Sequence, residues 1–249
     1  MLLNFLFFSL FLLTLLSIGN LFNYYVFKYK NSNLINSNNF ISSLFFLGFL
    51  LVFSNFFLPI KNYFLITLFL LICLYSIFFS KDILLETILK NIFIIFLIST
   101  ITFYMKVGYD GGLYHLPHQA IIRENKIIFG LFNLHERFGI ISIYGYISSV
   151  LWLKNNLLLL SYLQGFFYLF LFIFIKELIN DQNYKKKILG FATLIFVPIW
   201  IRFVDPSFSL VDMPSAIIFI FCFIKGIDLL ESKENLSINI KIFLISSVL

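Results

Sequence analysis

Long and nearly uncharged apolar runs recur along the chain, and they restrict its fold more than any other feature. A run of about 18 or more apolar residues is typical of a helix that crosses a lipid bilayer. We therefore predict an all-α, polytopic transmembrane helix bundle that forms one domain over residues 1–249. The runs cover residues 2–27, 40–60, 63–80, 91–105, 157–175, 188–201 and 215–230, and a further run begins near residue 240.

The composition supports this class of protein. Apolar residues make up 61% of the chain, charged residues 12%, and the mean hydropathy is +0.98, whereas roughly a quarter of residues are charged in a soluble domain. The net charge of +6 does not indicate nucleic acid, because Lys and Arg in cytoplasmic loops orient membrane proteins. Residues 1–20 lack a basic start and a small-residue cleavage site, which predicts a retained first span. Cys73 and Cys222 lie in separate apolar runs, so we expect neither a disulfide nor a metal pair.

The segment 139–153 decides the predicted topology. It is short for a span, and its Ser, Tyr and Gly content suits an amphipathic helix in the membrane interface. The loop 106–138 and the basic run Lys185–Lys187 then lie on opposite sides. One side holds eleven basic residues and the other seven: Lys28, Lys30, Lys81, Lys90, Lys176, Lys185, Lys186, Lys187, Lys225, Lys233 and Lys241, against Lys61, Lys106, Arg123, Lys126, Arg137, Lys154 and Arg202.

The basic side is predicted to be cytoplasmic, because Lys and Arg accumulate in cytoplasmic loops. This orientation places the loop 106–138 on the extracytoplasmic face, towards a periplasm or lumen. The last residues, "KIFLISSVL", stop about ten residues into an apolar run, which is too short to cross a bilayer. We therefore also expect the chain to be truncated at its C-terminus.

The loop 106–138 concentrates the polar chemistry of the chain. It begins with "YDGGLYHLPHQAIIREN", and it contains all three histidines: His115, His118 and His135. The glycines after Asp110 predict a sharp turn. Because Pro117 disfavours a helix through the residue before it, we expect a new short helix to open there. The N-terminus of such a helix is a ready site for an anion.

Structural interpretations compete with functional ones for these residues. Asp110 could cap a turn, and Asp212, two residues before a proline, could cap the following helix. Arg123 and Arg137 could anchor the loop at lipid head groups. His115 and His118 form an H-x2-H pair that His135 and Glu136 could complete as a zinc site, although that spacing is a weak signal. A divalent metal ion stays open as a cofactor, and none other is predicted.

A longer stretch, "YDGGLYHLP…IIRENKIIFGLFNLHERFG", resembles the first extracytoplasmic loop of GT-C superfamily glycosyltransferases, closest to a bacterial branch with YHLP and NLHxR(F/L)G patterns. The resemblance covers about Phe93 to Asp228 and includes "VDMP", which is similar to the second acidic position of the family. It implies a GT-C-like core over 91–230, preceded by extra spans over 1–90. The commonest family motif pairs two acids, whereas two glycines follow Asp110 here.

The resemblance implies transfer of a sugar from a polyprenyl-phosphate donor to an extracytoplasmic glycan, lipid or protein acceptor. Inverting transfer needs one carboxylate to take the proton of the acceptor, and cationic groups to neutralise the departing lipid phosphate. Asp110 is the predicted general base. The predicted substrate-binding residues are Tyr114, His115, His118, Arg123, Asn133, His135, Arg137 and Asp212.

Two other classes of function stay open. A transporter of lipid-linked glycans would carry ionisable residues inside its spans near the midplane, and the apolar runs hold almost none. A non-catalytic membrane subunit could keep the fold without the chemistry, which the absence of a second acid beside Asp110 permits.

Overall fold

The computed structural model describes residues 1–29, 33–134, 136–139, 142–152, 157–203, 212–231 and 236–249. These residues form ten α-helices and no β-strand, so the predicted all-α class is confirmed. The helices are α1 (Leu2–Phe27), α2 (Ser37–Asn55), α3 (Tyr63–Phe79), α4 (Lys81–Tyr104), α5 (Leu116–Glu124), α6 (Ile143–Leu151), α7 (Leu158–Asn180), α8 (Tyr184–Phe203), α9 (Asp212–Glu231) and α10 (Leu236–Val248).

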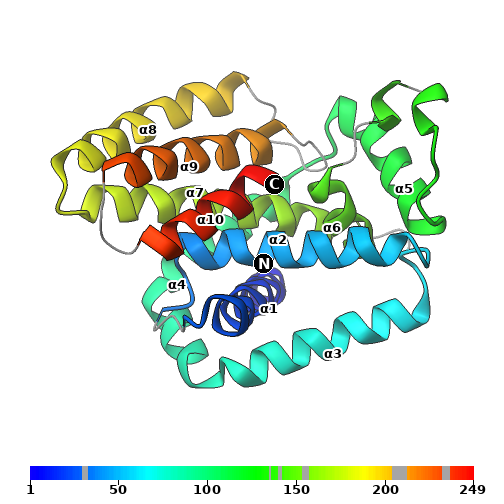
Figure 1. The fold of residues 1–249 in the computed structure, drawn as a ribbon, viewed down its shortest axis with the longest axis horizontal. Helices are drawn as coiled ribbons and strands as arrows, with labels where there is room; N and C mark the ends of the chain where they lie inside the picture. Colours follow the sequence, from blue (N-terminus) through cyan, green and yellow to red (C-terminus); the bar gives the residue numbers. More distant parts are fainter. Residues whose placement is uncertain (30–32, 135, 140–141, 153–156, 204–211, 232–235) are drawn as a thin grey trace.

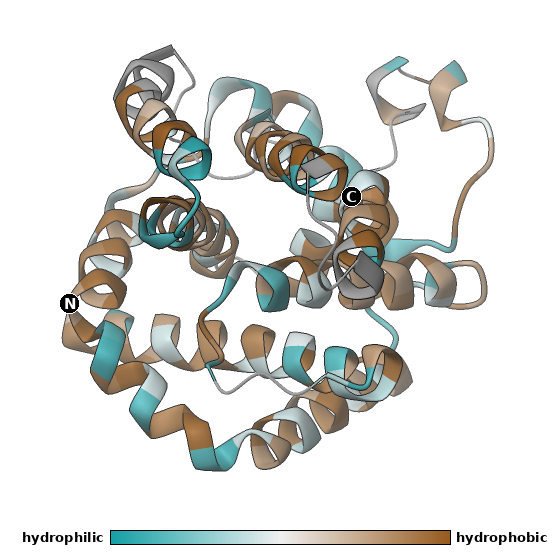
Figure 2. Ribbon diagram, turned by 60° about the vertical axis from the view of Figure 1, so that its left-hand side comes forward, coloured by the Kyte–Doolittle hydropathy of each residue, from teal (hydrophilic) through white to brown (hydrophobic). Residues whose placement is uncertain are grey.

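Five helices are long and apolar enough to cross a membrane: α1, α2, α4, α7 and residues Asp212–Leu230 of α9. Their length and composition support a multi-pass integral membrane protein. Figure 2 shows hydrophobic residues along most of the length of the helices. The predicted runs at α3, α8 and α10 do not meet both criteria within the described residues; α3, for example, has only 17 residues.

Helix α7 forms the centre of the bundle, and aromatic rings fix its neighbours. Phe166 and Phe170 are fully buried. The ring of Phe40 on α2 lies 4.6 Å from that of Phe166 and 5.4 Å from that of Phe170. On another side, the ring of Phe221 on α9 lies 4.9 Å from that of Phe174. These buried phenylalanines therefore serve as core packing between α2, α7 and α9.

Two glycines allow neighbouring helices to approach closely. A Cβ atom on Gly19 of α1 would lie 2.2 Å from the carbonyl oxygen of Asn39 on α2. A Cβ atom on Gly165 of α7 would lie 2.3 Å from a side-chain methyl of Thr102 on α4. Small residues at such contacts are a common way to pack helices in membranes. The polar side chains between α1 and α2 also pair, since Asn23 donates to Asn39 at 2.8 Å.

Helix α4 begins earlier than the apolar pattern predicts. The charged stretch 81–91 was expected to be a link between spans, but the structure shows it as the first turns of α4. An ion pair joins Glu86 and Lys90 at the i,i+4 spacing, and such pairs support a helix. The charged residues therefore lie outside the apolar run but inside the helix.

Helix α6 does not span, as predicted, but it is more enclosed than an interfacial helix. Its nine residues correspond to about 13 Å at 1.5 Å per residue, less than half of a bilayer core. Ile143 packs against Gly48 of α2, and the Tyr144 hydroxyl donates to Gln164 of α7 at 3.4 Å. The missing side chain at Gly48 makes room for α6 inside the bundle, which is why most of its residues are buried.

The bundle has two distinct ends (Figure 1). The connection between α7 and α8 lies at the left of that view, and α5 and its neighbours lie at the right. Asp110 and Asp212 belong to the α5 end, because α4 finishes there and α9 begins there, whereas Lys186 belongs to the other end. We name these the α5 end and the α7–α8 end.

Candidate functional site

The polar loop forms one helical segment that contains a π-helical turn. The segment starts at Tyr109, passes through a π-helix over Gly111–His115 and continues as α5. The backbone N–H of Leu116 donates to the carbonyl of Gly111, five residues earlier. The predicted glycine turn is therefore wrong: Gly130 has the only positive φ among the described glycines. The segment also runs through Leu116, because a π turn widens the backbone where the ring of Pro117 would otherwise collide with the preceding turn.

The buried side chain of Asn55 holds α5 against the bundle. Its Nδ2 atom donates to the carbonyl of Asn125 at 2.9 Å and to that of Ile122 at 3.3 Å. Its Oδ1 atom accepts from the Tyr146 hydroxyl on α6 at 3.3 Å. One residue at the C-terminal end of α2 thus ties together α2, α5 and α6, and these three helices position the site.

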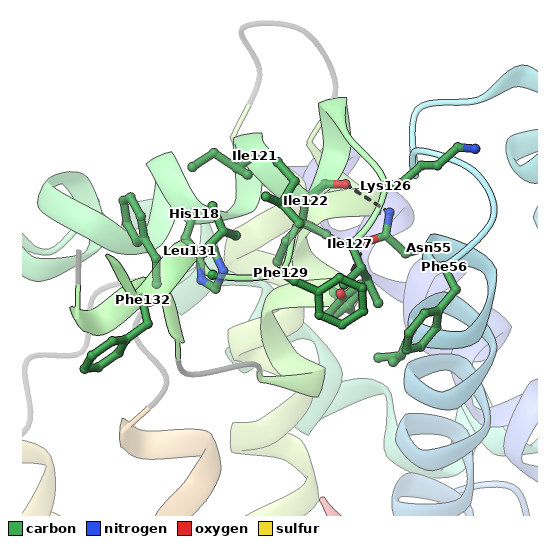
Figure 3. A pocket seen from close by; sticks show the side chains of 15 residues that line it. Asn55, Phe56, His118, Ile121, Ile122, Lys126, Ile127, Phe129, Leu131 and Phe132 are labelled. Atoms are coloured by element: carbon green, nitrogen blue, oxygen red, sulfur yellow. Dashed lines mark hydrogen bonds between the residues drawn. The ribbon is translucent and has the colours of Figure 1, made fainter. Parts of the chain in front are cut away.

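A cavity of about 290 Å³ lies beneath α5. Its walls are mainly apolar, and its polar members are Asn55, His118, Lys126 and Tyr146 (Figure 3). The other residues that line it are Val52, Phe56, Ile121, Ile122, Ile127, Ile128, Phe129, Gly130, Leu131, Phe132 and Phe138. Mainly apolar walls with a few polar groups are typical of ligand sites.

His118 is the predicted site residue that faces this cavity. Its ring stacks on that of Phe138, with 5.4 Å between the ring centres. Burial lowers the pKa of His118 below its ordinary value, because a low-dielectric surrounding disfavours the charged form. The imidazole is therefore neutral near pH 7 and can donate one hydrogen bond and accept another.

The other predicted residues on this helical segment do not line the cavity. Asp110 is half-buried at the start of the segment. The rings of Tyr114 and His115 lie 4.3 Å apart. Arg123 donates through Nη1 to the carbonyl oxygen of Trp152. The segment thus brings these residues onto one short element, with His118 between the acid and the arginine.

The remaining predicted residues are more dispersed. Asn133 is exposed in the 3-10 turn Leu131–Asn133, and Asp212 is exposed as the first residue of α9. His135 and the side chain of Arg137 fall outside the described part of the structure. Three or more metal-ligating side chains do not cluster anywhere in that described part. The possible zinc site needs His135 as a ligand, so that site stays a prediction.

A charged cluster at the α7–α8 end is a feature that the sequence patterns missed. Lys186 forms ion pairs with Asp181 at 3.1 Å and with Asp228 of α9 at 3.2 Å. Burial alone would lower the pKa of Lys186, but the two carboxylates outweigh it and raise that pKa. A cytoplasmic loop, as predicted for this basic run, would be exposed to water, yet the side chain of Lys186 is three-quarters buried. Lys225 and Asp228 lie three residues apart in one apolar run, and this pair is the feature of the sequence that could have indicated the charged cluster.

The comparisons place the chain in a family. Residues 1–249 match the family model described as "Domain of unknown function (DUF8201)". This chain belongs to the DUF8201 family. No curated protein and no solved structure matches the DUF8201 chain. Its function must therefore be argued from its own site.

Proposed function

We propose that this DUF8201 protein is a membrane glycosyltransferase that takes a sugar from a polyprenyl-phosphate donor. One observation carries the proposal: an apolar cavity with a few polar groups lies beside a helical segment whose first turn carries a carboxylate, Asp110. The sequence resemblance to GT-C enzymes supports the same activity. The five candidate spans provide the membrane setting that such a donor requires.

The cavity beneath α5 suits a lipid-linked phosphate. Its walls of Ile, Phe and Val side chains match the isoprene units next to the phosphate, and His118 and Lys126 can bind the phosphate oxygens. Lys126 is exposed just after α5, so its ammonium group can reach a head group without being buried. Arg123 adds positive charge near the cavity. Its hydrogen-bond partner, the carbonyl of Trp152, carries no net charge and so does not neutralise the guanidinium.

Asp110 is the general base in this proposal. It takes the proton of the acceptor hydroxyl while the hydroxyl oxygen bonds to the anomeric carbon of the sugar. The bond from that carbon to the donor phosphate breaks, and the phosphate leaves with the electron pair, which inverts the configuration. The eight residues from Asp110 to His118 correspond to about 12 Å along a helix, which leaves room for the sugar and the acceptor between them.

Further groups at the α5 end have supporting roles. Asp212 opens α9 at this end and orients the acceptor, while Tyr114, His115 and Asn133 bind the sugar or the acceptor. His135 and Arg137 complete the set. The α5 end is the extracytoplasmic one in this proposal, so the acceptor is a glycan, lipid or protein of the cell envelope.

The test is sugar transfer from a polyprenyl-phosphate donor by the purified protein. Asp110→Asn keeps the shape and removes the basicity, so transfer should fall by roughly 10²–10⁴-fold, the usual value of a positioned base. Asp82→Asn is the matched control, because Asp82 is exposed in the first turn of α4 at the opposite end; it should transfer at the parental rate. Thermal unfolding of both variants shows whether either change affects folding.

Transfer by Asp110→Asn at the parental rate would remove this residue from the chemistry. That result would favour the alternative of a non-catalytic membrane subunit. The other alternative, a transporter, has less support, because Glu177, Lys225 and Asp228 lie near the ends of α7 and α9 rather than at their middle.

A further inference from the structure

A second cavity, of about 280 Å³, lies at the α7–α8 end. Its walls are polar, in contrast to those of the cavity beneath α5. The residues that line it are Tyr29, Asn33, Asn36, Ser37, Asn38, Glu177 and Lys225. It is therefore separate from the proposed transfer site and is built from the N-terminal end of α2, the segment before it, and the ends of α7 and α9.

One carboxylate and one ammonium group face this cavity, and they attract each other without forming an ion pair within the described part of the chain. Glu177 accepts hydrogen bonds from the backbone N–H of Ser37 at 3.0 Å and from its hydroxyl at 2.5 Å. A carboxylate has about four acceptor positions, so Glu177 keeps about two for another donor. Lys225 is half-buried and forms no ion pair or hydrogen bond with any described residue. Its contact is with the ring face of Phe221, at 5.6 Å from the ring centre.

The side-chain amide of Asn38 gives an independent sign of a missing partner. Its Oδ1 atom is buried and accepts no hydrogen bond from the described residues. A buried acceptor without a partner is uncommon, because a buried oxygen that makes no hydrogen bond costs free energy. A ligand that donates hydrogen bonds to Glu177 would satisfy this oxygen as well once the Asn38 amide turns towards the cavity.

We propose that this cavity binds a zwitterionic head group of the phosphoethanolamine class. The ammonium group of the ligand donates to Glu177 and to Asn38, and its phosphate accepts from Lys225. A purely anionic ligand would meet the Glu177 carboxylate, and a purely cationic one would meet the Lys225 ammonium group. The amides of Asn33 and Asn36 provide further hydrogen bonds to the phosphate.

The position of the cavity favours a lipid as the source of this head group. The cavity lies where the candidate spans α2, α7 and α9 begin or end, which is the depth of the head groups in a bilayer. The ligand chemistry is the same for free phosphoethanolamine, so the experiment includes both forms.

The test is native mass spectrometry of the full chain in detergent with defined lipids. The protein should retain phosphatidylethanolamine about tenfold or more over phosphatidylcholine, whose quaternary ammonium has no N–H to donate to Glu177 or Asn38. Loss of the bound lipid on addition of millimolar phosphoethanolamine would show that the head group alone is recognised. Retention would show that the acyl chains contribute as well. Equal binding of the two lipids would overturn the proposal.

Two variants locate the binding. Glu177→Gln should reduce the preference for phosphatidylethanolamine about tenfold, because it weakens the acceptor of the ammonium group. Lys225→Gln should reduce the retention of both lipids about tenfold, because both carry the phosphate that Lys225 binds. Lys176→Gln is the matched control, since Lys176 is an exposed neighbour on the same helix; it should keep the preference. An unchanged preference in Glu177→Gln, or unchanged retention of both lipids in Lys225→Gln, would also overturn the proposal. The comparison of lipids on the parental protein decides the question if a variant fails to fold.

Discussion

Replacement of Asn55 by alanine should loosen α5 from the bundle. Asn55 is 1% exposed, and its two amide hydrogens serve the carbonyls of Leu58, Ile122 and Asn125. Its Oδ1 atom accepts a further bond from Tyr146. Hydrogen bonds between membrane helices contribute about 0.6 kcal/mol each on average, so these four bonds together contribute about 2–3 kcal/mol. The expected loss of stability is about 2–3 kcal/mol.

The assay for Asn55→Ala combines two measurements. A loss of that size should lower the thermal midpoint of a chain of this length by about 5–10 °C. Hydrogen exchange should accelerate at the amides of α5, because its main tether to α2 is gone. Asn125→Ala is the control, since its exposed side chain makes a single bond to Ile121 at 3.1 Å. Equal midpoints and equal exchange for the two variants would refute this account of how α5 is held.

Two further predictions concern packing and pH. Gly19→Ala should destabilise the protein by about 1–3 kcal/mol, because its new methyl group would collide with a backbone carbonyl of α2; Gly112→Ala, with 3.9 Å to the nearest atom, should be tolerated, and equal thermal midpoints would contradict this. Burial lowers the pKa of His118, so below about pH 6.5 the unfolded chain binds a proton that the folded chain does not, and stability should fall as the pH decreases. His118→Gln should remove that part of the pH dependence in unfolding measurements, and an unchanged slope would argue against a buried, neutral imidazole.

The sequence predicts the elements of this fold well because apolar runs indicate helices that can cross a membrane, whether or not the bundle buries them. The run at 2–27 coincides with α1, and the short segment at 139–153 contains the non-spanning α6. The early start of α4 was missed because charge was taken as the end of a helix. Local ion pairs such as Glu86 with Lys90 are compatible with a helix that extends beyond the apolar region.

The candidate sites were predictable only in part. The clustering of polar residues from Asp110 to Arg123 is visible in the sequence, because they are neighbours along the chain. The contact between Ser37 and Glu177 joins residues 140 positions apart, and no local pattern reports such a pairing. The enclosure of His118 likewise depends on Phe138 and on the end of α2, which only the tertiary structure brings together.

The π turn at Gly111–His115 changes which way Asp110 faces. On a regular helix, residues eight positions apart differ by about 80° around the axis, since each residue adds about 100°. A π turn holds one residue more than an α turn, so the angle between Asp110 and His118 falls to about 20°. The extra residue of the π turn therefore brings the carboxylate of Asp110 and the imidazole of His118 to the same side of the segment. Deletion of either glycine would shorten the π turn to a regular α turn, in which residues seven positions apart also differ by about 20°, so Asp110 and His118 would keep their common side.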